Sequence, residues 1–241
     1  MTSKPAEELA ETLVELADTL SAGFDLDDFL RLLANRCVRL LDVDAAGVFL
    51  IDHGVAASSE RVALLELSAQ RAEEGPARDC CRSGDPVLVP DLSLESRRWP
   101  TYVAEARRSG FAASHTLPLR RREELIGALT LFRVERGELE KTDVRLAQAM
   151  ADIATIGILG TRALRRQEKL AAQLQHALNS RVVIEQAKGV LAERLGLTMM
   201  AAFSALRTYA RSHNTRVSEL AVSIVDGKFN TDLLRGPNPK A

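Results

Sequence analysis

The sequence predicts a chain in two structured parts: an α+β domain, in which helices flank an antiparallel sheet, and then a long helix that leads into an all-α domain of three helices. One observation is the distribution of proline: all eight prolines lie at or before residue 118 or after residue 236, so residues 119–236 are free to be helical. The other is the apolar pattern. It changes between helical and strand-like segments in the first half and keeps a spacing of three and four residues from residue 142 onwards.

The first half is predicted to alternate helices and strands around a loop-rich stretch. An acidic turn opens the first helix, apolar runs read as strands, and Gly and Pro mark turns. In order, the predicted elements are a helix at 25–42, strands AAGVFLI at 45–51 and VALLELS at 62–68, short elements over 73–100, a helix at 100–109, and a hairpin of SHTLPLR and ELIGALTLFR across residues 121–123.

This order, together with the segments GDPVLVPDLS, RRWP, LPLR and LIGALTLF, resembles the GAF domain over residues 9–160. GAF is a sensory fold whose central pocket holds small molecules in many members, among them cyclic nucleotides, haem and tetrapyrroles. The resemblance implies a small-molecule ligand or a protein partner at this domain and leaves its identity open. No cofactor is evident from the residues themselves.

A continuous helix is predicted from Thr142, and its part at 143–180 is a helical linker with the spacing of a coiled-coil seam. A stripe this narrow on a projecting helix stays exposed unless a second copy covers it, so we expect a homodimer. The alternative, that the stripe only covers the sheet, suits residues 142–160 better than the charge-rich region that follows. The stripe consists of Leu146, Met150, Ile153, Gly157, Gly160, Leu164, Leu170, Leu174 and Ala177, with the two glycines as expected bend points.

Residues 170–230 are predicted to form three short helices around one core. Gly196 ends the first helix, Thr198 caps the second and Ser218 caps the third. The expected core comprises Val183, Ala187, Val190, Leu191 and Leu195 of the first helix, Met199, Phe203, Leu206 and Ala210 of the second, and Ala221, Ile224 and Val225 of the third, with Val217 and Val222 as a hydrophobic staple.

The segments SRVVIEQAKGVLAERLG, AFSALRTYARSHN and SELAVSIV resemble the ANTAR domain of bacterial transcription antiterminators over residues 170–227. The family's Ala-Lys-Gly signature falls on Ala187, Lys188 and Gly189. The resemblance implies a three-helix module that dimerises, is controlled by an attached sensor, and binds a pair of hairpins in nascent mRNA so that a terminator does not form. Val217 departs from the leucine expected before the last helix, which affects packing more than RNA contact.

The candidate RNA-binding residues lie on the polar sides of the first two helices. Lys188 is expected to be an exposed cation, and Gly189 leaves a notch beside it where RNA can approach the backbone. Tyr209 can stack on a base or be structural, and Arg207 can contact RNA or form a salt bridge within the bundle. The full set is Arg181, Ala187, Lys188, Gly189, Thr198, Arg207, Thr208, Tyr209 and Arg211.

Composition limits the other functional classes. The net charge is −1, but residues 161–230 hold eleven Lys or Arg against five Asp or Glu, which favours a polyanion partner at that end. Neither a leader segment nor a bilayer-spanning run is evident, so the sequence predicts a cytoplasmic protein without a membrane partner. The three cysteines and four histidines fall in no metal-binding spacing, so no metal site is expected.

Two rival functions remain. One is a DNA-binding transcription factor, with VSELAVSIV as a recognition helix, although that segment has no Arg, Asn or Gln to read base edges. The other is a thiol redox enzyme of the GAF type, with Cys80 and Cys81 as the reactive pair. Adjacent cysteines rarely form an unstrained disulfide, so we expect a protein that is not an enzyme and has no catalytic residues.

Overall fold

The computed structural model describes residues 10–12, 14–16 and 25–234, so the predicted start of the first domain at residue 9 lies outside the described residues. The chain divides into two compact units, residues 1–163 and 164–241. The elements, in order, are α2 (Leu26–Leu40), β1 (Ala45–Leu50), β2 (Gly54–Ala57), α3 (Glu60–Ala72), α4 (Pro76–Ser83), β3 (Val87–Val89), η1 (Leu92–Glu95), α5 (Pro100–Arg108), β4 (Ala113–Arg121), β5 (Glu124–Arg133), α6 (Lys141–Leu195), α7 (Met199–Ser212), α8 (Val217–Val225) and η2 (Thr231–Leu234).

The first unit is built on a five-stranded antiparallel sheet with the order β2-β1-β5-β4-β3. The predicted hairpin is confirmed, since β4 pairs directly with β5 and Arg122 takes a left-handed conformation in the turn, with φ 55°. The predicted first helix is also present. It begins after Asp25, whose carboxylate accepts hydrogen bonds from the backbone N–H groups of Asp27 and Asp28.

The prediction of a strand at residues 62–68 is wrong, because these residues lie within helix α3. Ser59 caps this helix by accepting a hydrogen bond from the N–H of Val62. The buried positions Val62, Leu65, Glu66 and Ala69 are spaced by three and four residues, which is the helical period. The strand that pairs with β1 is instead β2.

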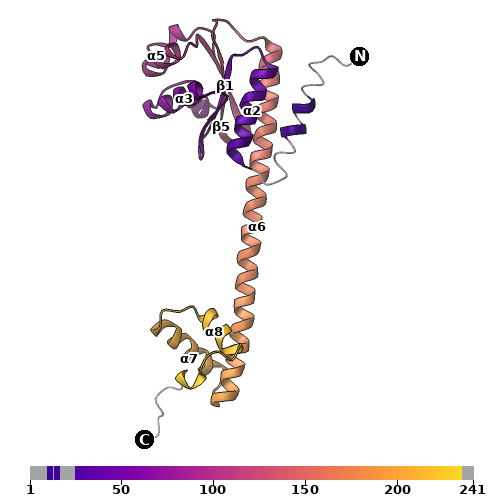
Figure 1. Cartoon of the computed structure of the whole chain (residues 1–241), viewed down its shortest axis with the longest axis vertical. Coiled ribbons are helices and arrows are strands. Elements are labelled where there is room, and N and C mark those ends of the chain that lie inside the picture. The colour runs from indigo at the N-terminus through magenta and orange to yellow at the C-terminus, as the bar shows by residue number, and fades with distance from the viewer. Residues whose placement is uncertain (1–9, 13, 17–24, 235–241) are drawn as a thin grey trace. The chain divides into compact units, whose positions relative to one another are not determined.

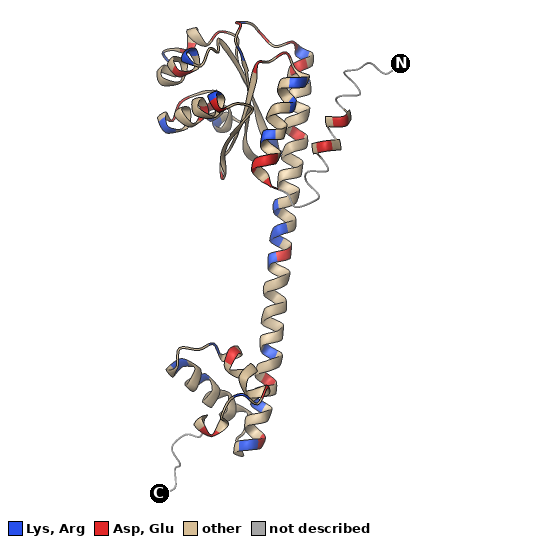
Figure 2. Ribbon diagram, viewed as in Figure 1, with Lys and Arg blue, Asp and Glu red and all other residues tan. Residues whose placement is uncertain are grey.

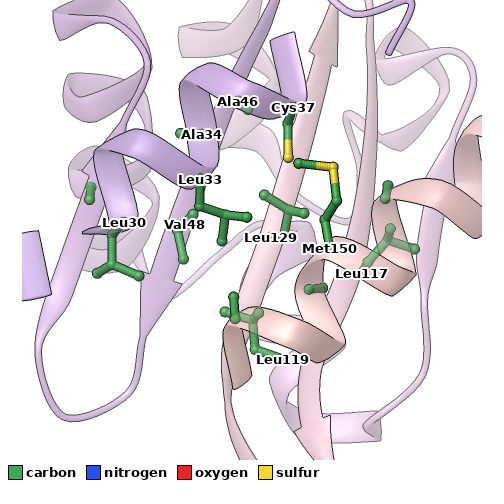
Figure 3. Packing of buried hydrophobic residues seen from close by; sticks show 14 of the residues in the cluster. Leu30, Leu33, Ala34, Cys37, Ala46, Val48, Leu117, Leu119, Leu129 and Met150 are labelled. Carbon is green, nitrogen blue, oxygen red and sulfur yellow. The ribbon is translucent and has the colours of Figure 1, made fainter. Parts of the chain in front are cut away.

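Helices cover both faces of the sheet (Figure 1). On one face, α2 and the beginning of α6 pack against leucines of the central strands, and Figure 3 shows Leu33, Cys37, Leu129 and Met150 meeting there. The other face is covered by α3 and α5 and holds most of the aromatic residues. Their cluster includes Val62, Leu65, Trp99, Tyr102, Phe111 and Phe132.

Helix α6 is continuous over its 55 residues, so the predicted long helix is present and runs unbroken through Gly157 and Gly160. Residues 163–179 are exposed at every position. Among the described residues, no single helix has both the length and the apolarity to cross a membrane. The pair α6 and α7 passes that test only together, and it is bent by 107° at the break between them.

The second unit packs the end of α6, α7, α8 and η2 around one small core that contains Ala187, Leu191, Leu206, Ala210 and Ile224. Gly196 ends α6 in a left-handed conformation, with φ 66°, as predicted. Thr198 caps α7 through its hydroxyl oxygen, which accepts a hydrogen bond from the N–H of Ala201.

Three predictions about this core are wrong. Helix α8 begins two residues earlier than expected: Arg216 is its N-cap residue and Ser218 lies inside the helix, so the staple of Val217 and Val222 is not at the cap. On α7 the buried row is Ala202, Leu206 and Ala210, whereas Met199 and Phe203 are 45% and 39% exposed. Val225 is also largely exposed, since the buried residues of α8 are Leu220, Ala221 and Ile224.

Candidate functional site

Lys188 lies at the contact between α6 and α7 and is not the freely exposed cation that was expected. Its side chain is only 16% exposed and its ammonium group forms an ion pair with Glu185 at 2.8 Å. The same group lies 5.7 Å from the centre of the Phe203 ring, within the range of a cation–π interaction. Lys188 therefore joins the polar side of α6 to one flank of α7.

That flank of α7 carries Phe203, Arg207 and Arg211, which succeed one another at intervals of four residues and so lie along one side of the helix. Both arginines are exposed, and neither forms an ion pair among the residues that the structure describes. Met200, on the same side of the first turn, is 82% exposed. We call Lys188, Met200, Phe203, Arg207 and Arg211 the basic-aromatic face.

Gly189 borders this face on α6. A Cβ atom added to it meets no heavy atom within 4 Å, so packing within the chain does not explain the glycine. A glycine inside a helix costs about 1 kcal/mol relative to alanine. Gly189 thus leaves the helix backbone beside Lys188 uncovered by a side chain. No close contact among the described residues requires a glycine there, despite its cost to helix stability.

The remaining predicted residues are placed differently. Ala187 is fully buried in the core, and Thr198 uses its hydroxyl group as a helix cap. Arg181 and Thr208 are exposed. Tyr209 lies on the other side of α7, where its ring stacks on His213 at 3.8 Å between ring centres and meets Phe229 edge-on at 5.1 Å. Tyr209 is therefore engaged by its own domain, and Phe203 is the aromatic residue that the sequence interpretation missed.

A second unusual site lies within the first unit, between the sheet and helix α3. Glu66, Tyr102 and Ser114 are buried, and Oε1 of Glu66 has no hydrogen-bond partner among the described residues; the hydroxyl groups of Tyr102 and Ser114 interact with each other without meeting full hydrogen-bond geometry. Thr116 and Thr130 join the same layer, with their hydroxyl groups hydrogen-bonded at 3.2 Å. Buried polar groups are normally paired, so this cluster is an exception that calls for a cause.

Burial raises the pKa of Glu66 to about 7, and a hydrogen bond with Thr130 opposes that rise. The side chain lines a cavity of about 220 Å³, together with Phe49, Ile51, Gln70 and Cys81. The lining also includes Glu74 and Arg78, so the cavity combines apolar side chains with several polar ones, among them the carboxyl group of Glu66 that titrates near neutral pH. It can accept a small molecule whose polar groups pair with Glu66. The sequence interpretation missed this site because it assigned Glu66 to a strand.

Comparison with family models assigns both units. The model described as "GAF domain" matches residues 25–158, more than half of the chain. The chain belongs to the GAF domain family. The model described as "ANTAR domain" matches residues 172–225, which include the end of α6, all of α7 and all of α8. A GAF domain joined to an ANTAR domain is the composition of a signal-controlled regulator, and both domains are typically regulatory and not enzymatic.

Solved structures agree on the fold of the GAF domain. The GAF domain of an Acinetobacter phosphoenolpyruvate-protein phosphotransferase has a TM-score of 0.50 and 14% identity, covering 68% of this chain and 97% of that chain. The GAF domain of the corresponding protein from Coxiella burnetii has a TM-score of 0.50 and 19% identity, covering 68% of this chain and 99% of that chain. Comparison with curated proteins gives no match.

The cysteines of the GAF domain do not resemble a reactive pair. Cys80 and Cys81 lie on helix α4, and Cys80 is fully buried. Burial raises the pKa of Cys80 to about 12 and that of Cys81 to about 11. The thiolate is the nucleophilic form of cysteine, so thiols with these pKa values are poor nucleophiles at neutral pH. The geometry therefore gives no support to the thiol redox alternative.

Proposed function

We propose that the chain is a signal-responsive transcription antiterminator whose ANTAR domain binds paired hairpins in mRNA leaders and whose GAF domain receives the signal. The observation that carries the proposal is the basic-aromatic face. Hairpin loops present unstacked bases and phosphates, which proteins recognise with aromatic rings and cations. Phe203 offers a partly exposed ring, and Arg207 and Arg211 offer charges that no acidic side chain in the described part of the domain neutralises.

Gly189 supports the same proposal from the other helix. Its open flank lets an RNA backbone or base come close to α6 next to Lys188, where a side chain of any other residue would stand in the way. Arg181 lies two turns before Lys188 on α6 and extends the positive charge along the helix. Ala187 and Thr198 then contribute through packing and capping, and Tyr209 through the internal stack.

We further propose that the chain acts as a homodimer through α6. Leu164, Leu170 and Leu174 are more than half exposed in the single chain, as is Leu178 further along the helix, and Val182 is half exposed. Figure 2 shows that the middle of α6 lacks charged residues, and the sequence has none from Ala171 to Ser180. An uncharged, leucine-bearing stretch of this kind is buried when two copies pair along it. A dimer also supplies two ANTAR domains for two hairpins.

The DNA-binding alternative receives little support from α8. Its largely exposed residues are Glu219, Val222 and Val225, followed by Asp226 at the C-cap. Carboxylates repel phosphates, and valines form no hydrogen bonds with base edges. The face that carries cations lies on α6 and α7 instead.

The test is RNA binding by the full chain with both exposed arginines neutralised. Arg207→Gln with Arg211→Gln should weaken binding to a two-hairpin leader RNA by tenfold or more at physiological salt, because two charge-assisted phosphate contacts are lost. The matched control is Arg194→Gln with Arg216→Gln, which removes the same charge elsewhere in the unit. Equal loss in both variants would show that only net charge matters, and wild-type affinity in the first variant would place the RNA elsewhere.

A further inference from the structure

A second cavity in the GAF domain lies on the opposite face of the sheet from Glu66. Along β4, Ser114 and Thr116 face α3, whereas the residues between and beyond them, His115, Leu117 and Leu119, face α2 and α6. The cavity measures about 360 Å³. It is lined by His115, by Leu88 and Pro90 at β3, by Glu138 and Leu139, and by Lys141, Val144 and Arg145 of the first turns of α6.

His115 is the unusual residue of this cavity. It is 1% exposed, and neither of its ring nitrogens has a hydrogen-bond partner among the described residues. A neutral imidazole carries one donor and one acceptor, and leaving both unpaired in the interior costs free energy. Leu88 and Leu131, its neighbours on the adjacent strands, provide no polar group from their side chains. The cavity is therefore the place from which a partner for His115 can come.

The cations of the cavity come from α6. Lys141 and Arg145 are four residues apart, so they lie on the same side of the helix, and both are exposed. Neither takes part in an ion pair within the described ranges. Glu138 contributes one negative charge to the lining. Arg133, which is not part of the lining, is already paired with Asp42. Two cations, one carboxylate and a neutral imidazole leave a net positive lining.

The apolar part of the lining is equally definite. Leu139 is buried, Val144 is half-buried, and Leu88 and Pro90 form an exposed apolar rim. A ligand that fits must therefore present anionic oxygens to Lys141, Arg145 and His115 and an apolar group to the remaining wall.

We propose that this cavity is a binding site for a small organic anion, a carboxylate or a phosphate monoester with a compact apolar group. The anion accepts hydrogen bonds from the ammonium of Lys141 and the guanidinium of Arg145, and His115 donates one from its ring N–H. Binding joins β4 to the first turns of α6, so the site can bias the helix that leads into the second unit. The proposal requires nothing of the RNA-binding face and stands or falls separately from it.

The pKa of His115 gives an independent readout. Burial lowers this pKa, and the nearby positive charge of Arg133 lowers it further. The backbone of Gly137 and the carboxylate of Glu138 act in the opposite direction. Neither of them forms a hydrogen bond of normal geometry with the ring nitrogens. Lys141 and Arg145 are the other charges that line the cavity. An anion placed between them and the ring favours the imidazolium. Occupation of the site should therefore raise the pKa of His115.

The experiment is a titration of the full-length protein by NMR, with the imidazole signal of His115 observed. The probes are isovalerate and phenyl phosphate, and the neutral control is isovaleramide, which matches the first probe in shape. At least one anion should give a saturable shift of the His115 signal, should raise its pKa, and should bind at least tenfold more tightly than the amide. The two anions also separate carboxylate from phosphate recognition.

Lys141→Gln with Arg145→Gln should weaken anion binding at least tenfold, and both positions are exposed, so the fold should be kept. The matched control, Arg107→Gln with Arg121→Gln, removes two exposed cations elsewhere in the domain and should stay within twofold of the wild type. The proposal is overturned if neither anion gives a saturable shift, if neither anion binds more tightly than isovaleramide, or if the anion that binds the wild type keeps its affinity in the Lys141 and Arg145 variant.

Discussion

The two units depart from an ordinary folded domain in opposite ways. In the GAF domain the exceptions are polar groups inside: Glu66, Tyr102, Ser114 and His115 are buried with polar atoms that lack a hydrogen bond of full geometry. In the ANTAR domain the exceptions are exposed apolar groups that stand beside cations, among them Met200 and Phe203, although the GAF domain also exposes apolar side chains such as Leu64 and Leu94. Unpaired polar atoms in an interior favour small polar ligands, whereas exposed apolar side chains beside cations favour a large partner. The difference is consistent with the proposed division of labour, in which the first unit receives a small molecule and the second presents a surface to RNA.

The largest expected effect is on the proposed dimer contact along α6, the helix that runs from the first unit into the second. Leu174→Glu would place a carboxylate in each chain at the centre of the leucine stripe, and in a coiled coil both would be buried. We expect the dimer to weaken at least a hundredfold, measured by sedimentation equilibrium, with a parallel loss of affinity for a two-hairpin RNA.

Gln173→Glu is the matched control, because it adds the same charge at an exposed position beside the stripe. A Leu174→Glu protein that dimerises like Gln173→Glu would remove α6 as the dimer contact. In that case the exposed leucines of α6 would need another explanation, and α6 would not link dimerisation to RNA binding.

The next effect concerns the buried carboxyl of the GAF domain. The pKa of Glu66 is raised from 4.5 to about 7, so the folded state holds the proton more tightly than the unfolded chain. The resulting stabilisation is fully present below pH 4.5 and is lost as the pH rises to about 7. Since each pKa unit is worth about 1.4 kcal/mol, the loss is about 3 kcal/mol.

Glu66→Gln should therefore stabilise the GAF domain at pH 8 by up to about 3 kcal/mol and change its stability little at pH 4, as measured by urea unfolding of the full chain. Gln70→Glu is a useful contrast, because it places a carboxyl group on the same cavity at a partly exposed position. A Glu66→Gln protein with the pH dependence of the wild type would show that the carboxyl group is not buried in solution.

The two units also differ in how far their sequence could predict them. The hairpin of β4 and β5, the helix α2 and the long α6 follow from apolar spacing and turn residues. Helix α3 could not be predicted in this way, because a mostly apolar run of seven residues is compatible with either a strand or a helix. Only the cap at Ser59 and the helical spacing of the buried residues from Val62 to Ala69 distinguish the two. That error removed Glu66 from consideration.

In the ANTAR domain the elements were predicted well, whereas the buried row of α7 was predicted only in part: Leu206 and Ala210 are buried as expected, but Met199 and Phe203 are exposed. A stripe through Met199 and Phe203 and a stripe through Ala202 and Leu206 share the same spacing, and they differ only by a rotation of the helix. Larger side chains normally take the buried row, yet here the small Ala202 is inside and Phe203 is outside. The exposed ring lies 5.7 Å from the ammonium group of Lys188, a contact that the apolar pattern alone does not predict.

A smaller effect tests whether the exposed Phe203, and not Tyr209, is the aromatic residue of α7 that contacts RNA. Phe203→Leu keeps an apolar side chain beside Lys188 and removes the aromatic face, so RNA affinity should fall by on the order of 1–2 kcal/mol with little change in stability. Tyr209→Leu should do the reverse, since it removes the stack on His213 and the edge contact with Phe229. Fluorescence anisotropy with a hairpin RNA and thermal unfolding measure the two quantities. If Tyr209→Leu is the variant that loses RNA affinity at constant stability, the binding surface lies on the other side of α7.

The smallest expected effect comes from Gly189→Ala, a single substitution that should raise stability and lower RNA affinity. The added methyl group of Gly189→Ala meets open space, and alanine is the better helix former, so the ANTAR domain should gain up to about 1 kcal/mol. The same methyl group occupies the flank through which RNA reaches the backbone beside Lys188, so affinity should fall. Gly160→Ala is the control on the same helix, where the added methyl group also meets nothing within 4 Å. Because Gly160 belongs to the predicted dimer stripe, sedimentation equilibrium must show that this variant still dimerises. That control should stabilise α6 without weakening RNA binding. A Gly189→Ala protein that gains stability and keeps its RNA affinity would mean that the open flank faces solvent in the complex, and the basic-aromatic face would then have to contact RNA through α7 alone.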